Sequence, residues 1–380
     1  MSRVCLWGTS LEKAADEAQF LAVVRLVKHV DATAEITVLA RPSRRSIIYD
    51  VAGVSVIRTA NIAAVSAALA RADLMIMVGG CFMESRSQAA VCTGVTMLAR
   101  LCRTPVIGVG VTAFPYRTAW GRQVYRKIFN AMEAISVREP SAQTAISDLE
   151  ITTRITQLAD PRLVLVPAAD SVARGLLRGQ GISFDRPLAC VTLRHLHDRM
   201  PGWVKHSHNY SSEAADRANR AIAGVLDALA SVAQLVLLPM HPRLDEDVAA
   251  SNAIQAHMRD PTALHVGLPQ LRAPELMAVM KRCDLILASR LAAGLFAVAT
   301  ATPFIGIGYE QRLQSLMSEL SLETFVLPWF DLDSKRLQVM AEHVWANRER
   351  IRATMISASE PLVQSAWANA ELIARYARKP

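Results

Sequence analysis

The feature of this sequence that most constrains its fold is a regular alternation of short apolar runs and longer amphipathic stretches. Apolar runs such as residues 3–8 and 74–80 alternate with stretches such as residues 15–30, in which apolar residues recur at three- and four-residue spacings. This alternation is typical of a parallel sheet whose strands are connected by crossover helices. The strands predicted in the first half of the chain are residues 3–8, 34–40, 54–58, 74–80, 104–111, 134–139 and 153–160.

The same pattern starts again at residues 170–177, a helical stretch that leads into a second series of apolar runs, with a further helix predicted over residues 213–230. Two successive halves predict an α/β protein with two Rossmann-like, doubly wound domains, residues 1–175 and 176–380, facing a cleft. The strongly helical C-terminal stretch is counted with the second domain. The strands predicted in the second half are residues 188–194, 233–241, 263–268, 284–289, 303–309 and 325–328.

The composition supports two packed cores and a basic surface. The 380 residues are 52% hydrophobic and 20% charged, and the formal net charge is +8. Arginines are spread along the chain without a long basic run, and aromatic residues make up only 6%, so a nucleic-acid-binding surface is not indicated. A basic surface of this kind suits anionic small molecules or the anionic inner face of a membrane.

The sequence has neither the pattern of a membrane span nor that of a secretion signal. No window reaches the roughly eighteen uninterrupted apolar residues of a spanning helix. The first residues, MSRVCLWGTS, enter a strand pattern without a charged leader and cleavage site. We therefore expect a cytoplasmic protein that can also contact the inner face of the membrane. The six cysteines form no CxxC pair and are expected to be reduced core residues.

Glycines and polar residues follow several predicted strands, which is where parallel sheets gather their ligand sites. Gly79 and Gly80 follow one apolar run and fit either a close approach to a ligand or a tight turn. Arg194 and His195 follow a second run, and His241 follows a third. A single histidine at such a place is more often an ordinary loop residue than a ligand. His195 begins a His-x-His pair, but no third ligand stands at a fixed offset, so no metal site is predicted.

Arg290 stands between a predicted strand, residues 284–289, and a helix predicted to run to about Thr300. At a strand-to-helix junction, a guanidinium and the N–H groups of the helix N-terminus can jointly hold a phosphate or a carboxylate. The sequence therefore predicts an anion site. The alternative is an ordinary salt bridge to Asp284 or Glu310.

Several stretches carry a resemblance to a known family. They are ADEAQ, DLMIMVGG, GVGVTAF, AISVREPSAQTAI, LADPRLVL, VTLR and SRLAAGLFAVATATPFIGIGYEQRLQSLMSEL. Together they resemble the polysaccharide pyruvyl transferase family, whose members are similar to two-domain GT-B glycosyltransferases. The stretches occur in family order over roughly residues 3–350, and the combination of VREPSAQ, ADP and SRL followed by TPFIGIGYEQRLQSLMSEL is the most specific.

The chain departs from the family's pattern at a few positions. Ala292 follows Arg290 and Leu291 where the family has a histidine, which the resemblance makes the catalytic proton donor. Ala15 replaces the glycine of the family's Gly-Asp-Glu-Ala motif. The family's glycine-rich loop is shortened here to Gly79, Gly80 and Cys81. Both an engineered inactivating substitution and natural divergence explain the alanine, and the drift at other motif positions favours divergence.

The resemblance implies an enzyme that moves a pyruvyl group from phosphoenolpyruvate to a pair of sugar hydroxyls in a cell-envelope or exopolysaccharide glycan, forming a ketal. Arg194 and Arg290, beside Leu291, would hold the phosphate and the carboxylate of this co-substrate in the second domain, the donor side. The position of Ala292 would deliver the proton. No metal and no further cofactor is needed. Asp160, in the LADP stretch, is expected to shape a turn near the domain boundary.

The first domain would be the acceptor side, where a glycan or a lipid-linked sugar meets Gly79, Gly80 and Glu84. A solvated loop carboxylate is the alternative for Glu84. Without a histidine at the catalytic position, His195, His197 and His241 are the available substitutes, and His195 and His241 would contact the substrate. Two other function classes remain: a GT-B glycosyltransferase with a nucleotide-sugar donor, and a catalytically impaired homologue that binds a glycan or an anion.

Overall fold

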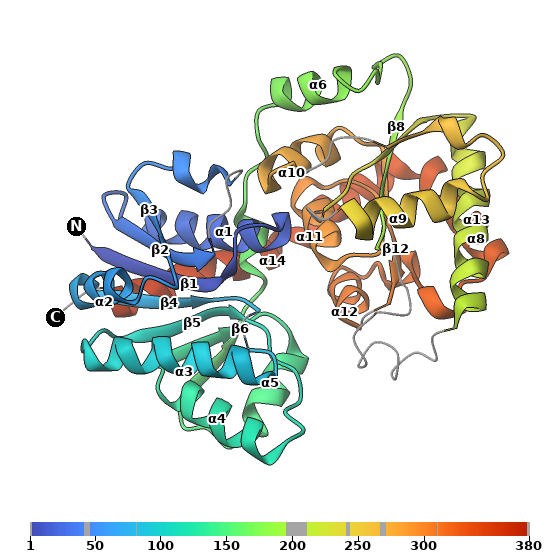
Figure 1. Cartoon of the computed structure of the whole chain (residues 1–380). Helices are drawn as coiled ribbons and strands as arrows, with labels where there is room; N and C mark the ends of the chain where they lie inside the picture. Colours follow the sequence, from blue (N-terminus) through green and yellow to red (C-terminus); the bar gives the residue numbers. More distant parts are fainter. Residues whose placement is uncertain are drawn as a thin grey trace. The chain divides into compact units, whose positions relative to one another are not determined.

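The chain divides into two compact units (Figure 1). The first unit comprises Met1–Leu165 together with Pro361–Pro380, and the second unit comprises Val166–Glu360. The computed structural model describes residues 2–41, 46–80, 82–194, 211–240, 244–266, 271–309 and 311–377.

The first unit is built on a seven-stranded parallel sheet with the order β3-β2-β1-β4-β5-β6-β7. All seven strands predicted for this half of the sequence are confirmed. They are β1 (Arg3–Ser10), β2 (Glu35–Arg41), β3 (Val54–Arg58), β4 (Leu74–Val78), β5 (Val106–Val111), β6 (Ala134–Val137) and β7 (Arg154–Gln157). The helices that follow them are α1 (Ala14–Val30), α2 (Ile62–Arg71), α3 (Arg86–Leu101), α4 (Ala119–Asn130) and α5 (Pro140–Ser147).

Helices cover both faces of the first sheet, as expected for a doubly wound arrangement. Buried side chains of α2, α3, α4 and α5 join those of the strands in one core cluster, to which α1 contributes nothing. Helix α1 lies on the other face of the sheet (Figure 1). The central strand β4 is buried along its whole length, because it lies in the middle of the sheet with helices above and below it.

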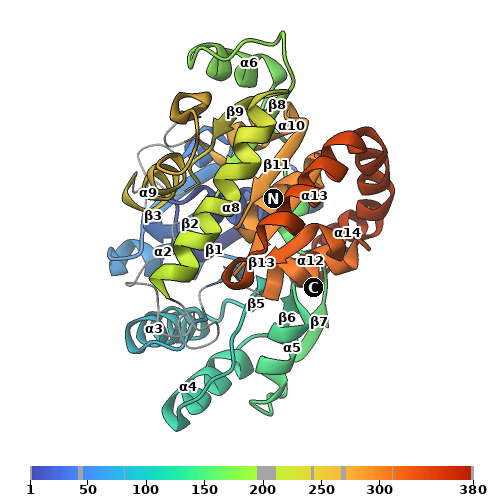
Figure 2. The same cartoon turned by 90° about the vertical axis from the view of Figure 1, so that its right-hand side faces the viewer.

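The second unit repeats this architecture with a six-stranded parallel sheet of order β10-β9-β8-β11-β12-β13. The six strands predicted for this half are also confirmed. They are β8 (Leu188–Thr192), β9 (Gln234–Leu237), β10 (Leu264–Val266), β11 (Leu285–Ala288), β12 (Phe304–Gly308) and β13 (Val326–Pro328). The helices are α6 (Asp170–Arg178), α8 (Ser212–Ala230), α9 (Leu244–Gln255), α10 (Ala273–Lys281), α11 (Leu291–Thr300), α12 (Gln311–Glu319), α13 (Ser334–Ala346) and α14 (Arg348–Ala377). Helix α8 packs against β9, α9 and α13, and Figure 2 shows it along its length.

The end of the chain belongs to the first unit, whereas the sequence placed it in the second. Helix α14 runs across the boundary, and residues after Pro361 bond to the first sheet. The Ser136 hydroxyl donates to the Asn369 side chain at 2.6 Å, and the Ala159 N–H donates to the Ser365 hydroxyl at 2.9 Å. The boundary in the middle of the chain also shifts, from residue 176 to Val166. These side-chain contacts link residues far apart in the sequence, which a periodicity pattern does not encode.

Among the described helices, none is both long enough and apolar enough to cross a membrane.

Candidate functional site

The carboxyl ends of β8 and β11 meet at the point where the second sheet reverses its strand order. The two strands are parallel neighbours, and the chain proceeds outward from them in opposite directions, to β9 and to β12. Arg194 follows β8 and Arg290 follows β11, so both arginines predicted from the sequence stand at this switch point. Ligands of doubly wound sheets bind at such points.

Backbone bonds hold the two strand ends together. The Ser289 N–H donates to the Thr192 carbonyl at 3.1 Å, and the Arg194 N–H donates to the Ser289 hydroxyl at 2.8 Å. Ser289 therefore connects the segments that carry Arg194 and Arg290. The Thr192 hydroxyl, in a residue only 1% exposed, has no hydrogen-bond partner among the described residues.

Arg290 is the N-cap residue of α11, as the predicted strand-to-helix junction required. Its carbonyl accepts from the N–H groups of Ala293 and Gly294 at 3.0 and 3.2 Å. Leu291 and Ala292 form the start of the first turn, where backbone N–H groups have no acceptor within a helix. The junction thus combines a guanidinium with the positive end of a helix.

The Arg290 side chain is 15% exposed and forms an ion pair with Asp247, whose side chain is 2% exposed. Asp247 also accepts from the Met240 N–H at 2.8 Å, so the end of β9 fixes its position. The predicted alternative partner Asp284 instead accepts from the Leu188 N–H at 3.0 Å, at the opposite edge of the sheet. The salt-bridge alternative is therefore confirmed in kind, with Asp247 as a partner; Glu310, the other predicted partner, lies outside the described residues.

Arg194 packs on Tyr309, which directly follows β12. Its Nη1 donates to the Tyr309 hydroxyl at 3.2 Å, and its guanidinium carbon lies 5.6 Å from the centre of the ring. A guanidinium over an aromatic ring is held by a cation–π contact. This edge of the sheet thus brings two guanidinium groups and the N-terminus of α11 together.

Comparison with known proteins agrees with this arrangement. A sequence model of the polysaccharide pyruvyl transferase family matches residues 16–311. The chain belongs to the polysaccharide pyruvyl transferase family. Membership supports an enzyme of the transferase class with a role in polysaccharide pyruvylation.

Solved structures show that the chain has a fold of the GT-B type, as predicted. A protein from Listeria monocytogenes assigned as a UDP-N-acetylglucosamine 2-epimerase superimposes with a TM-score of 0.63 at 14% identity, covering 98% of this chain and 95% of that one. A glycosyltransferase from Rickettsia africae gives 0.61 at 9% identity, covering 99% and 98%. The ADP-heptose LPS heptosyltransferase II of Escherichia coli gives 0.55 at 12% identity, covering 92% and 100%.

The histidine position of the pyruvyl transferase motif is a buried alanine here. Ala292 is 6% exposed and lies in the first turn of α11, two residues after Arg290. An alanine side chain can neither give nor take a proton. His195, His197 and His241, the predicted substitutes, lie outside the described residues.

The residues predicted for the acceptor side lie after β4. Gly79 has a φ of +67°, and a Cβ there would lie 2.0 Å from the Gln19 side chain, so the position requires glycine. Gly80 borders open space. Glu84 accepts from the N–H groups of Arg117 and Thr118, at 2.8 and 2.9 Å, at the start of α4.

The hydrogen bonds of Glu84 also affect its titration. Burial favours the neutral form, but the bonds from Thr118 and Arg117 outweigh it and hold the pKa of Glu84 below its ordinary value. A carboxylate engaged in this way stabilises the loop before α4. Glu84 is not among the residues that line the pocket at this edge of the sheet.

That pocket, of about 390 Å³, lies where β1, β2 and β3 end and where α1 and α3 begin. Sequence reasoning missed most of its residues. Asp16 belongs to the ADEAQ stretch, but it was not singled out from its neighbour Glu17. The two carboxylates differ: Glu17 is fully buried and accepts from Ser46 and Ile47 at 2.7 and 3.0 Å, whereas Asp16 lines the pocket.

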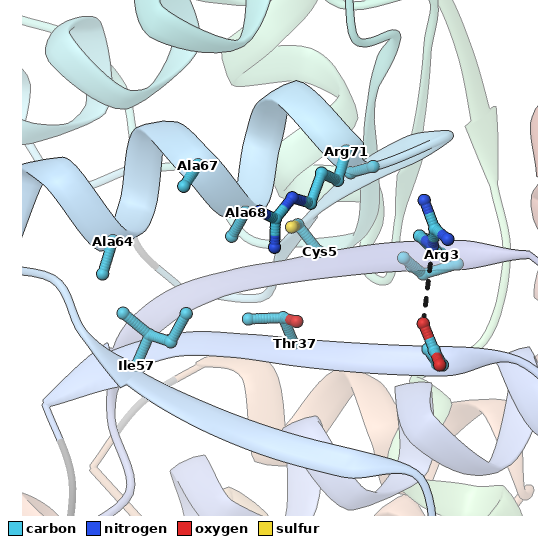
Figure 3. A pocket seen from close by; sticks show the side chains of 11 residues that line it. Arg3, Cys5, Thr37, Ile57, Ala64, Ala67, Ala68 and Arg71 are labelled. Atoms are coloured by element: carbon cyan, nitrogen blue, oxygen red, sulfur yellow. Dashed lines mark ion pairs between the residues drawn. The ribbon is translucent and has the colours of Figure 1, made fainter.

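A larger pocket of about 610 Å³ lies elsewhere in the first unit, between α2 and the strands β1, β2 and β3 (Figure 3). Ala64, Ala67 and Ala68 of α2 face it, and their small side chains leave the space open. Arg3 and Glu35 form an exposed ion pair of 3.4 Å at its rim. Because these two residues begin β1 and β2, this pocket extends to the amino edge of the sheet, away from the strand ends where ligand sites gather.

No group of three or more His, Cys, Asp and Glu side chains that could hold a metal ion occurs within the described part of the chain.

Proposed function

We propose that this protein transfers a pyruvyl group from phosphoenolpyruvate to two hydroxyls of a cell-envelope or exopolysaccharide sugar, forming a ketal. The observation that carries the proposal is the pair Arg194 and Arg290 at the two central strand ends of the second sheet, beside the N-terminus of α11. Phosphoenolpyruvate carries a phosphate and a carboxylate, and two guanidinium groups match those two anions.

The reaction divides into steps that these residues can support. A proton adds to the methylene carbon, and positive charge develops at the carbon that bears the phosphate. One sugar hydroxyl bonds to that carbon and releases its proton. The second hydroxyl then forms the second C–O bond as the bond to phosphate breaks, and its proton leaves with the phosphate. Arg194 and Arg290 would orient the donor and stabilise the departing phosphate.

Protonation is the step that this chain supports least. A positioned acid contributes about 100- to 10,000-fold to such a step. Ala292 supplies none, so turnover in this protein is expected to be slow by about that factor unless another group acts. The same alanine favours the second candidate function, a homologue that binds the anionic donor without rapid turnover.

A thermal-shift comparison tests the ligand class. We expect phosphoenolpyruvate to raise the melting temperature more than inorganic phosphate does, because it offers two anionic groups. Stabilisation by UDP-glucose without stabilisation by phosphoenolpyruvate would contradict the proposal and favour a nucleotide-sugar transferase.

Restoring the histidine separates an impaired enzyme from a binding protein. With phosphoenolpyruvate and an acceptor glycan, Ala292→His should increase phosphate release by about 100- to 10,000-fold. Ala292→Asn is the matched control, because asparagine is also polar but cannot transfer a proton. An equal rate in both variants would show that the catalytic acid lies elsewhere.

A further inference from the structure

The 390 Å³ pocket of the first unit has the placement of a ligand site. It lies at the carboxyl edge of the parallel sheet and is lined by the ends of three strands and the first turns of two helices. Pockets of this size bind small molecules, and this edge of a doubly wound sheet is where they bind. The residues that matter most for its chemistry are Trp7, Glu12, Lys13, Asp16, Arg41 and Gln88.

The charges around this pocket balance. Lys13 and Arg41 contribute two positive charges, and Glu12 and Asp16 contribute two carboxylates. A phosphate that approached the cations would also meet the carboxylates, so the pocket is poorly suited to an anion. A sugar hydroxyl both donates and accepts hydrogen bonds and can therefore use cationic and anionic groups together.

Asp16 is the carboxylate best placed to receive a hydroxyl proton in a hydrogen bond. It lies in the first turn of α1, half-buried. Burial raises the pKa of Asp16 above its ordinary value, although Lys13, Arg162 and Arg138 act in the opposite direction and Glu12 adds to the rise. A carboxylate that has lost part of its hydration gains more from an O–H donor than a solvated one does.

Trp7 is the aromatic residue of this pocket. It lines the pocket, is only 2% exposed, and its indole N–H has no acceptor among the described residues. A ring this buried forms part of the pocket wall and leaves little of its face for a sugar to stack on.

We propose that this pocket binds the sugar that accepts the pyruvyl group, with one sugar hydroxyl donating to Asp16. The inference rests on the proposed function for the identity of the ligand as an acceptor. It replaces the earlier expectation that Glu84 contacts the acceptor, because the Glu84 carboxylate is held at the start of α4.

Saturation-transfer NMR on the full-length protein tests the pocket. The probes are the methyl glycosides of glucose, galactose, mannose and N-acetylglucosamine. We expect transfer to at least one of them, lost in Val91→Trp, because Val91 lines the pocket, is 48% exposed, and can be enlarged without burying bulk in the core. Asp16→Asn should weaken binding of the same glycoside about tenfold, the typical effect of losing a hydrogen bond to a charged group.

Two matched variants control for the larger pocket. Ala67→Trp places the same ring at an exposed position in that pocket, and Glu35→Gln neutralises an exposed carboxylate at its rim. Both should leave the NMR signal unchanged, and thermal unfolding of all four variants confirms that they are folded. Absence of transfer to every glycoside would overturn the proposal, as would transfer that survives Val91→Trp and Asp16→Asn. Displacement of the glycoside by inorganic phosphate at low concentration would assign the pocket to an anion instead.

The proposal for the donor site and the proposal for the acceptor pocket can be tested independently of each other. If glycosides bind in this pocket and phosphoenolpyruvate does not stabilise the protein, the acceptor pocket holds and the donor assignment fails. If phosphoenolpyruvate binds and no glycoside does, only the pocket inference fails.

Discussion

The carboxyl edges of the two sheets share one topology but treat their arginines differently. In the first unit, Arg138 and Arg162 are 5% and 4% exposed and both pair with Asp160, at 3.2 and 2.7 Å. In the second unit, Arg194 donates to the Tyr309 hydroxyl, and Arg290 pairs with Asp247. One edge therefore holds a buried network of two arginines around one aspartate, and the other holds the two arginines that we propose bind the donor. What differs is the side chain that faces each guanidinium.

The largest effect is expected where the charges of the first edge are fully enclosed. Asp160→Asn removes the carboxylate and leaves Arg138 and Arg162 buried without it, which should cost about 3–5 kcal/mol of unfolding free energy. Urea unfolding measures this loss. An unfolding free energy within about 1 kcal/mol of wild type would show that the network is solvated and that the two edges do not differ as described.

The pH dependence of stability sharpens the same point. Burial alone would raise the pKa of Asp160, but Arg162 and Arg138 hold it below its ordinary value. A carboxyl group whose pKa is lower in the folded state stabilises the fold above its unfolded pKa of about 3.9, and this contribution is lost as the pH falls below that value. Wild-type stability should therefore drop on acidification through about pH 4, and the slope should be shallower in Asp160→Asn.

The second-largest effect is expected at the carboxyl edge of the second sheet, where we propose that the donor binds. Arg290→Met should weaken phosphoenolpyruvate binding about 10- to 100-fold, as expected for a lost charge-assisted hydrogen bond of about 1.5–3 kcal/mol. Because the single change leaves Asp247 buried with its charge, the double variant with Asp247→Asn serves as the folded reference. Calorimetric titration with phosphoenolpyruvate measures the affinity of the single and double variants. The control is Arg282→Met, which removes an arginine that pairs with Asp170. Equal affinity in all three proteins would remove Arg290 from the donor site.

The sequence predicted the strands and the positions of Arg194 and Arg290 because these follow from local patterns. A buried parallel strand is a continuous apolar run, and the residue after it necessarily lies at the carboxyl edge. The prediction could not supply Asp247 as the partner of Arg290, since the two are 43 residues apart and meet only in the folded sheet. Asp247 did stand in the charged segment after a predicted strand, and that placement was the available signal.

Side-chain direction was the second limit. The ADEAQ stretch has two adjacent carboxylates, Asp16 and Glu17. The sequence alone does not indicate that Glu17 is buried in the interior while Asp16 lines the pocket. On a helix, neighbouring residues point about 100° apart, so one residue of register decides the role. The expected turn at Asp160 is confirmed, because that aspartate caps the short helix Pro161–Val164. The pairing of Asp160 with Arg138 and Arg162 could be identified only from the folded structure.

A smaller effect is expected at the bond that joins the two donor strand ends. Ser289→Ala removes the acceptor of the Arg194 N–H and should cost about 1–3 kcal/mol, because Ser289 is 3% exposed and the N–H would lose its partner. Phosphoenolpyruvate affinity should fall by less than in Arg290→Met, since both guanidinium groups remain. A larger loss of affinity than in Arg290→Met would mean that the backbone geometry at this edge matters more than charge.

The smallest effect separates the two interpretations of Glu84. Glu84→Gln retains an oxygen that accepts from Arg117 or Thr118 but loses the charge at the start of α4, so unfolding should change by about 1 kcal/mol or less. If Glu84 only holds this loop, the NMR signal of the bound glycoside stays unchanged while the melting temperature falls slightly. If the signal disappears at an unchanged melting temperature, Glu84 contacts the acceptor after all, and the charge balance assigned to the first edge must include a third carboxylate.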